Sequence, residues 1–117
     1  MNNRVKGSVY EEQAASFFVS EGYTVLERNY NRKTGEIDLI LRDPEGILVF
    51  AEVKYRGKAR TGFPEEAVTA WKMQRIYRTA EWYLKEHGLP FETPCRFDVV
   101  SVLGRSYTHI PNAFGGF

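Results

Sequence analysis

The sequence predicts an α/β fold in which a mixed β-sheet is flanked by helices. Two stretches place apolar residues at helical spacing, and four others are rich in β-forming residues. Their order along the chain is α-β-β-β-α-β. With 117 residues the chain has the size of one ordinary domain, so residues 1–117 are expected to form a single domain.

The first half of the chain predicts one helix and three strands. The helix is expected from about Ser8 to Glu21, closed by Gly22, because Ser8 and Glu11 have the spacing of a capping box. Short turns between the strands favour an antiparallel meander, and a turn-prone segment, residues 29–33, follows the first of them. The three strands are expected at residues 23–27, 36–42 and 47–55.

The second half predicts a crossover helix and a last strand. The helix is expected to begin at Pro64, with two glutamates in its first turn, and to run to about His87 before Gly88. A strand at residues 96–103 follows, and a strand–helix–strand unit favours a parallel, right-handed connection. Residues 107–110 belong to a short tail.

Composition excludes several classes of protein. The chain has 16 Lys plus Arg against 15 Asp plus Glu, a formal charge of +1, which excludes nucleic-acid binding through bulk charge alone. One cysteine, Cys95, excludes a disulfide framework and a cysteine-based zinc site, and fits a reducing compartment. No apolar run approaches the length of a membrane span, and the first residues lack a signal-peptide core. We therefore expect a cytoplasmic protein with no membrane partner.

Ionisable side chains interrupt the two central strands. Acids and lysines are rarely buried unless they are paired or bind a metal. Opposed residues on neighbouring strands lie about 5 Å apart, so Asp38, Glu52 and Lys54 are expected to converge at one end of the sheet. Strict alternation predicts which side chains share a face of each strand. In the first of these strands, one face carries Ile37, Leu39 and Leu41, and the opposite face carries Glu36, Asp38 and Ile40. In the second strand, one face carries Leu48, Phe50, Glu52 and Lys54.

This convergence has a chemical use and a structural alternative. Two carboxylates are natural ligands for Mg²⁺ or Mn²⁺, and a lysine beside them can hold an attacking water or neutralise charge on a phosphate. The alternative is an ion pair of Lys54 with Glu52 or Asp38 that caps the strand ends. Spacing alone favours the ion pair, because Glu-x-Lys is a common string.

Basic residues gather after the second acid. No acid occurs between Glu52 and Glu65, where glycines predict a loop, and the following helix carries further cations. Such segregation suits a polyanionic substrate, although a solvated surface is the alternative. The basic residues are Lys54, Arg56, Lys58 and Arg60 in the first segment and Lys72, Arg75 and Arg78 on the helix.

Other candidates have structural interpretations. Arg96 and Asp98 are two residues apart on the same strand face, so we expect them to pair. His87 and His109 are isolated and lack the spacing of a zinc site.

Two strings give the chain a family resemblance. Gly35-Glu36-Ile37-Asp38-Leu39-Ile40 and Val49-Phe50-Ala51-Glu52-Val53-Lys54-Tyr55-Arg56 resemble the bacterial YraN family, small proteins related to archaeal Holliday-junction resolvases. The resemblance extends over nearly the whole chain, as an ordered set of short matches. It includes Gly7, Glu11, Ala14, Gly22, Tyr23, Arg28, Asn29, Ala67, Val68, Lys72, the string from Arg96 to Val100, His109, Ala113 and Phe114.

The resemblance implies a restriction-endonuclease-like αβββαβ core with a PD-(D/E)XK site. By position, Asp38 and Glu52 would be metal ligands, Lys54 would position the attacking water, and Glu11 would be a helix-borne acid at the same metal. The implied activity is Mg²⁺- or Mn²⁺-dependent endonucleolytic cleavage of DNA at branched structures, by a homodimer that cuts two strands. The residues expected to hold flanking phosphates are Arg56, Lys58, Arg60, Lys72 and Arg75.

Two other functional classes stay open at this point. The chain could be a nucleic-acid-binding or scaffold domain that keeps the nuclease fold without catalysis. It could also be a protein-interaction module in which the acids and Lys54 form only ion pairs.

Overall fold

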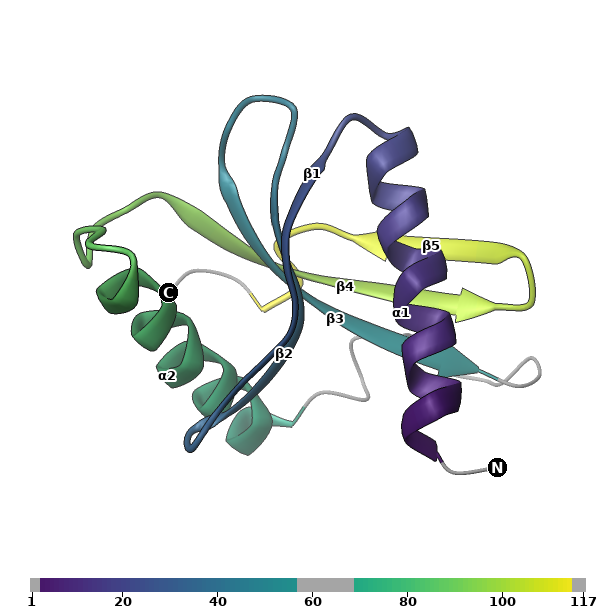
Figure 1. Cartoon of the computed structure of the whole chain (residues 1–117), viewed down its shortest axis with the longest axis horizontal. Coiled ribbons are helices and arrows are strands. Elements are labelled where there is room, and N and C mark those ends of the chain that lie inside the picture. Colours follow the sequence, from purple (N-terminus) through teal and green to yellow (C-terminus); the bar gives the residue numbers. More distant parts are fainter. Residues whose placement is uncertain (1–2, 57–68, 115–117) are drawn as a thin grey trace.

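The structure, a computed structural model, describes residues 3–56 and 69–114. The predicted order of elements is confirmed, with one strand added at the C-terminal end (Figure 1). Neither helix in the described part of the chain combines the length and the apolar character needed to cross a membrane. The elements are α1 (Asn3–Ser20), β1 (Thr24–Arg32), β2 (Gly35–Arg42), β3 (Leu48–Arg56), α2 (Ala70–Glu86), β4 (Cys95–Leu103) and β5 (Ser106–Ile110).

All five strands form one mixed sheet in the order β1-β2-β3-β4-β5. The first three strands form the predicted antiparallel meander, and β3 and β4 are parallel across α2, as predicted. The residues treated as a tail form the edge strand β5, antiparallel to β4. Helices α1 and α2 cover opposite faces of this sheet (Figure 1).

The predicted start of the first helix is wrong. Helix α1 begins at Asn3, so Ser8 lies inside it and cannot act as its N-cap. No proline in the preceding residues stops the helix from extending past Ser8. Its predicted end is confirmed, because Gly22 has a φ of 91° and the Tyr23 amide donates to the Phe18 carbonyl at 2.9 Å.

Strand β1 and helix α2 also differ from the predicted bounds. Strand β1 continues through Arg32, because Asn29 adopts a φ of 53° and Tyr30 packs into the core under α2. Helix α2 begins at Ala70, since extended Thr69 is its N-cap and accepts a hydrogen bond from the Lys72 amide at 3.2 Å. The expected first turn at residues 64–66 lies outside the described residues.

Two hydrophobic clusters fill the space between the sheet and its helices. Phe50 packs with Ile40 under α2, whereas Leu39 and Leu41 pack under α1. Ile37 also lies under α2, so the predicted grouping of Ile37 with Leu39 and Leu41 is wrong.

The alternation of β2 breaks at Asp38. Arg28 pairs with Leu39 and Tyr30 pairs with Ile37, and these pairs skip Asn29 and Asp38. The sheet therefore changes its regular pattern at the position where the sequence places an acid.

Candidate functional site

The site lies where β2 and β3 diverge. Their pairing runs from Arg42 opposite Leu48 to Leu39 opposite Ala51 and stops there. The next residues along the two strands are Asp38 and Glu52. Instead of a strand ladder, the Asp38 carboxylate accepts a hydrogen bond from the Val53 amide at 2.8 Å. The two acids are therefore held at the same end of the sheet.

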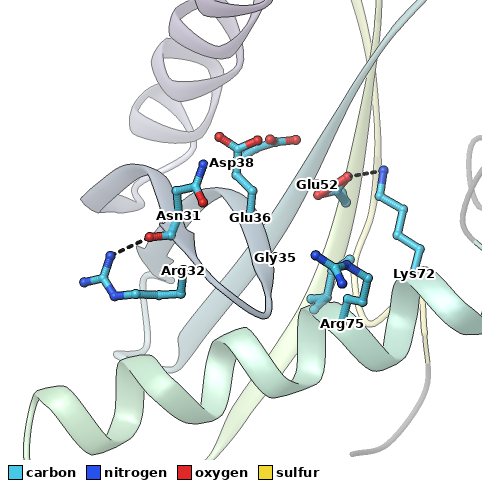
Figure 2. Close-up of a pocket in the computed structure, with 9 residues that line it drawn as sticks. Asn31, Arg32, Gly35, Glu36, Asp38, Glu52, Lys72 and Arg75 are labelled. Carbon is cyan, nitrogen blue, oxygen red and sulfur yellow. Dashed lines mark hydrogen bonds and ion pairs between the residues drawn. The ribbon is translucent and has the colours of Figure 1, made fainter.

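A pocket of about 320 Å³ opens beside these two acids (Figure 2). Strands β2 and β3 place carboxylates on one side of it, and α2 places basic side chains on the other. Gly35 lets the start of β2 pack closely against α2, because a Cβ at this position would lie 3.3 Å from the Thr79 hydroxyl of α2. The φ of 148° at Gly35 also favours glycine. The lining residues are Asn31, Arg32, Gly35, Glu36, Asp38, Glu52, Lys72, Arg75 and Ile76.

Glu52 is shared by two lysines. It is only 6% exposed, and its Oε1 lies 2.9 Å from Lys72 Nζ and 3.4 Å from Lys54 Nζ. Burial lowers the pKa of Lys54, and the neighbouring ammonium of Lys72 lowers it further. Burial also acts to lower the pKa of Lys72, but attraction to Glu52 outweighs it and the net shift is upward. Glu52 is thus firmly anchored by two cations.

Asp38 has no cation of its own among its contacts in the described structure. Burial raises its pKa well above the ordinary value, and the negative charge of Glu52 raises it further, against the opposing hydrogen bond from Val53. Part of its surface still faces the pocket. The Asp38 carboxyl is therefore a partly enclosed acid in a region of excess negative charge.

Glu11 of α1 extends this acidic region. Burial raises the pKa of its carboxyl, and the charges of Glu36 and Glu52 add to the effect, although hydrogen bonds with Asp38 and Asn29 oppose it. Its carboxyl therefore points to the sheet end and does not fold back on its own helix. We call Glu11, Asp38, Glu52, Lys54 and Lys72 the carboxylate–lysine site.

The donor set of this site fits a small divalent cation. Within the residues the structure describes, no three His, Cys, Asp or Glu side chains are grouped as a complete metal site. Mg²⁺, however, is commonly held by one or two carboxylates, with water and substrate phosphate supplying the remaining oxygens. Asp38 and Glu52 supply two such carboxylates. The pKa of Asp38 is raised first by burial and then by the negative charge of Glu52, and a bound cation would offset both.

The structure brings together most of the predicted site residues. Asp38, Glu52 and Lys54 converge as expected, Glu11 lies beside Asp38, and the predicted phosphate-binding Lys72 and Arg75 line the same pocket. The Arg56 side chain and all of Lys58 and Arg60 lie outside the described part of the structure. The chemical roles assigned to these residues stay predictions.

Sequence reasoning missed the direct contact of Lys72 with Glu52. The pocket also includes Glu36, which the sequence predicted on the same strand face as Asp38, and Arg32 from the turn predicted before that strand. Helical spacing indicated part of this arrangement. Lys72 lies four residues before the buried Ile76, on the same side of the helix, and Arg75 directly precedes Ile76 in the sequence. The contact itself depends on the packing of α2 against β3.

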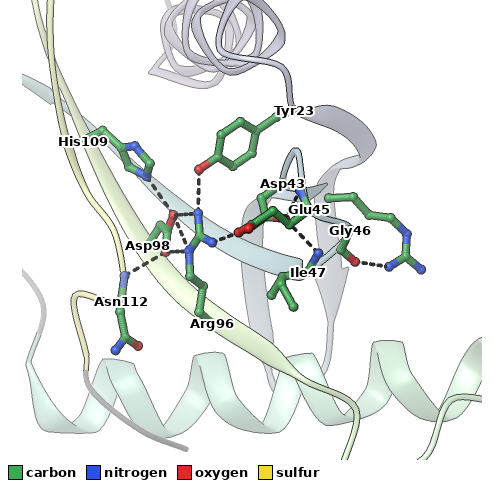
Figure 3. Close-up of polar contacts among 10 residues, drawn as sticks. Tyr23, Asp43, Glu45, Gly46, Ile47, Arg96, Asp98, His109 and Asn112 are labelled. Carbon is green, nitrogen blue, oxygen red and sulfur yellow. Dashed lines mark hydrogen bonds and ion pairs between the residues drawn. The ribbon is translucent and has the colours of Figure 1, made fainter.

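A second polar cluster surrounds Arg96 on the α1 side of the sheet (Figure 3). The predicted pair is confirmed, because Arg96 Nε donates to Asp98 at 3.0 Å. The same guanidinium donates to Asp43 at 2.7 Å and to the Tyr23 hydroxyl at 2.5 Å. Together with His109, whose Nε2 lies 2.7 Å from Asp98, these residues form what we call the arginine network.

Every acid of the arginine network is compensated. Burial alone would raise the pKa of Asp98, which is 0% exposed, but hydrogen bonds from His109, Arg96 and the Asn112 amide lower it. Asp43 likewise has a lowered pKa, because amide and Arg96 hydrogen bonds outweigh its burial. The network connects β4 to β5 and to the β2–β3 turn, which indicates a structural role.

Comparison with known proteins places the chain in a family. Residues 10–102 match the profile of uncharacterised protein family UPF0102. The chain belongs to this family, which confirms the membership inferred from the sequence strings.

Bacterial relatives match over almost their whole length. A UPF0102 protein of Lachnoclostridium phytofermentans is 48% identical over 117 residues, which cover 100% of this chain and 98% of the relative. One from Pectobacterium carotovorum is 43% identical over 115 residues, 97% of each chain. One from Symbiobacterium thermophilum is 49% identical over 102 residues, 87% of this chain and 84% of the relative.

Proposed function

We propose that this protein is a metal-dependent endonuclease that hydrolyses DNA phosphodiester bonds at branched or distorted structures. The observation that carries the proposal is the convergence of Asp38 and Glu52 at a pocket that Lys72 and Arg75 also line, with Lys54 in contact with Glu52. A binding surface for a polyanion needs cations, but it has no use for two enclosed acids at its centre.

Asp38 and Glu52 would hold Mg²⁺ or Mn²⁺. Once bound, the ion would supply Lewis-acid stabilisation of charge on the scissile phosphate and its leaving oxygen. The excess negative charge around Asp38 favours a bound divalent ion as its counter-charge.

The cations of the chain would handle substrate and water. Lys54 is partly buried and lies beside Glu52, so it would orient the water that attacks phosphorus. Lys72 and Arg75 would bind phosphate oxygens across the pocket. Glu11, which hydrogen-bonds with Asp38, would be the helix-borne acid at the same metal.

The order of elements supports a restriction-endonuclease-like classification. The α-β-β-β-α-β order, the parallel β3–β4 pair and the acids on β2 and β3 are the features that this fold requires. A homodimer is part of the proposal, since a branched junction has two strands to cut. The carrying observation is still the site itself, because a fold alone does not define an activity.

The test is cleavage of an end-labelled four-way junction and of a matched linear duplex, with Mn²⁺, Mg²⁺ or EDTA. Metal-dependent cuts made by the wild type and absent from Asp38→Asn, purified in parallel, are the expected result. The ratio of junction to duplex cleavage reports substrate preference.

Lys54→Ala separates the roles of the two acids from that of the lysine. It is expected to keep the rise in melting temperature caused by metal, because ligands that bind only the folded state stabilise it. Its cleavage rate should nevertheless fall by about a hundredfold. Equal loss of metal stabilisation and rate would contradict the role assigned to Lys54.

A non-catalytic nucleic-acid-binding or scaffold domain is the second candidate. The ion pairs of Glu52 with both lysines favour it, because they satisfy this acid without a metal. It predicts salt-sensitive DNA binding, no cleavage with any metal, and a melting temperature that metal does not change.

A further inference from the structure

The outer surface of α2 carries a stripe of tryptophans and cations. Trp71 is 71% exposed and Trp82 is 42% exposed, although large aromatic side chains are usually enclosed. Three basic residues lie between or beside them on the same helix. We call this set the tryptophan–cation stripe: Trp71, Arg75, Arg78, Trp82 and Lys85.

Helical geometry places the five side chains on one face. At about 100° per residue, positions 71, 75, 78, 82 and 85 fall within about 80° of one another. The residues that α2 buries, including Ala80 and Tyr83, lie on the other side of the helix. The two tryptophans are about 16 Å apart along the axis. The stripe therefore faces away from the sheet over most of the helix.

Each tryptophan is paired with a cation. The Arg75 guanidinium lies 5.0 Å from the ring centre of Trp71, and the Lys85 ammonium lies 5.2 Å from that of Trp82. A groove of about 430 Å³ runs beside Trp82 and is lined by Thr34, Arg78, Glu81, Trp82 and Lys85. The stripe thus combines flat apolar surfaces with positive charge at each end.

We propose that the tryptophan–cation stripe binds unpaired nucleotides of a nucleic-acid strand. Bases would stack on Trp71 and Trp82, while Arg75, Arg78 and Lys85 would bind the phosphates between them. Aromatic platforms inside a basic track are the combination by which proteins hold single strands without reading sequence. Paired bases of a duplex offer no free faces, so they would not engage the tryptophans.

Charge argues against a second copy of the chain as the occupant. A twofold interface would place the stripe against itself, so three cations would face three cations. The acids nearest to it leave an excess of positive charge, because Glu81 is one acid beside three cations and Glu86 is engaged by Arg32 at 2.8 Å and by the Tyr30 hydroxyl. A polyanion with exposed flat rings satisfies both components of the stripe.

The stripe is continuous with the carboxylate–lysine site. Arg75 lines the pocket of that site and also covers Trp71, and the β1–β2 turn separates this pocket from the groove at Trp82. Resting on the proposed nuclease function, the inference narrows the substrate to DNA with a single-stranded segment beside the scissile phosphate, such as a flap or a splayed junction arm.

Intrinsic fluorescence tests the inference directly, because the chain's 2 tryptophans both lie on the stripe. The whole protein is titrated in EDTA with oligothymidylate, with an abasic oligonucleotide of equal length, and with a matched duplex. Because the titration contains no metal, it measures binding without cleavage. Its outcome therefore does not depend on whether the protein is a nuclease. Stacking predicts strong quenching by oligothymidylate and little by the other two ligands.

Variants assign the binding to the two rings. Trp71→Ala and Trp82→Ala should each weaken oligothymidylate binding by about tenfold, within the range known for base stacking. Trp71→Phe and Trp82→Phe keep a ring and should retain most of the affinity, and each reports the quenching of the remaining tryptophan. Phe91→Ala, at another exposed aromatic residue, is the control. Melting temperatures establish that each variant is folded.

Several outcomes would overturn the inference. Equal affinity for abasic and thymidylate strands would show that the stripe binds phosphate alone. Tighter binding of duplex, or unchanged affinity in both alanine variants, would remove the role of stacking. A wild-type dimer in light scattering that either alanine variant converts to monomer would assign the stripe to self-association.

Discussion

The carboxylate–lysine site and the arginine network both combine acids with cations, at different places on the sheet, yet their charges are balanced differently. In the arginine network, Asp98 accepts hydrogen bonds from Arg96, His109 and a backbone amide, and its pKa is lowered. In the carboxylate–lysine site, Asp38 accepts one from Val53 and has a raised pKa. The difference separates charges that stabilise the fold from charges that are available to a ligand.

The two kinds of buried acid have opposite effects on stability, and this explains why one chain carries both. A buried acid whose pKa is lowered contributes stability at neutral pH, and one whose pKa is raised detracts from it. An arrangement that costs stability persists where it serves a function, and perturbed acids in a pocket are therefore candidates for such a role. By this criterion Asp38 marks the functional site, and Asp98 does not.

Replacing the shared acid of the carboxylate–lysine site should have the largest effect. Glu52→Gln keeps the shape of the side chain but removes a proposed metal ligand and the counter-charge of Lys54 and Lys72. We expect metal-dependent cleavage to fall by more than about a thousandfold and the metal-induced rise in melting temperature to disappear. Gel-shift affinity for DNA should persist, and retained cleavage would contradict the assignment.

Removing the central cation of the arginine network should lower the free energy of unfolding without affecting the carboxylate–lysine site. Arg96→Met leaves Asp98 and Asp43 without their shared cation. Unfolding free energy, measured by urea denaturation, should fall by about 3–5 kcal/mol. Arg28→Met is the control, because its ion pair with Glu12 is exposed and should contribute less than about 1 kcal/mol. Similar losses in both variants would remove the distinction between the clusters.

The smallest expected effect concerns Arg75, a pocket cation that forms no ion pair within the described part of the chain. Arg75→Gln should weaken DNA binding and reduce the slope of log affinity against log salt by about one, because one phosphate contact is lost. Stability should stay within about 0.5 kcal/mol of the wild type. Arg105→Gln, in the exposed β4–β5 turn, is the matched control, and an equal change of slope there would show that only net charge matters.

Much of the fold was predictable because periodicity and turn residues are local signals. The order of elements, the antiparallel meander and the parallel β3–β4 pair followed from patterns such as the apolar run before Glu52. The start of α1 was not, because a Ser–Glu spacing is compatible with a helix interior when nothing before it ends the helix. Strand β5 was not predicted, because its residues are partly exposed and because its pairing with β4 is a tertiary contact that the local sequence does not indicate.

The convergence of Asp38, Glu52 and Lys54 was predictable from the short distance between opposed residues on neighbouring strands, but their balance of charge was not. Three tertiary contacts set that balance: Lys72 from α2 reaches Glu52, Glu11 from α1 reaches Asp38, and Val53 donates across the split between the strands. None of them has a local signal. The break in alternation at Asp38 depends equally on Asn29, whose positive φ no neighbouring residue indicates.

The pH dependence of stability follows from the two directions of shift. Below the folded pKa of Asp98, which is lower than its unfolded value of about 4, both acids are protonated in both states and neither contributes. As pH rises, the lowered pKa of Asp98 adds stability, which is lost again as pH falls through its folded value. For Asp38 the sign is opposite, because its raised folded pKa means that stability is lost as pH rises through that value.

The most direct test of the account is therefore one paired measurement, the unfolding free energy of Asp38→Asn and Asp98→Asn by urea denaturation between pH 4 and pH 7. Asparagine removes the charge and keeps one acceptor oxygen at each position, and at Asp98, where both oxygens accept, it also replaces one acceptor by an NH2 group. At pH 7 we expect Asp38→Asn to be at least as stable as the wild type and Asp98→Asn to be less stable by about 2 kcal/mol or more; toward pH 4 the first difference should narrow, whereas the second should persist. Equal destabilisation of the two variants at pH 7 would contradict the claim that one cluster stabilises the fold and the other is reserved for a ligand.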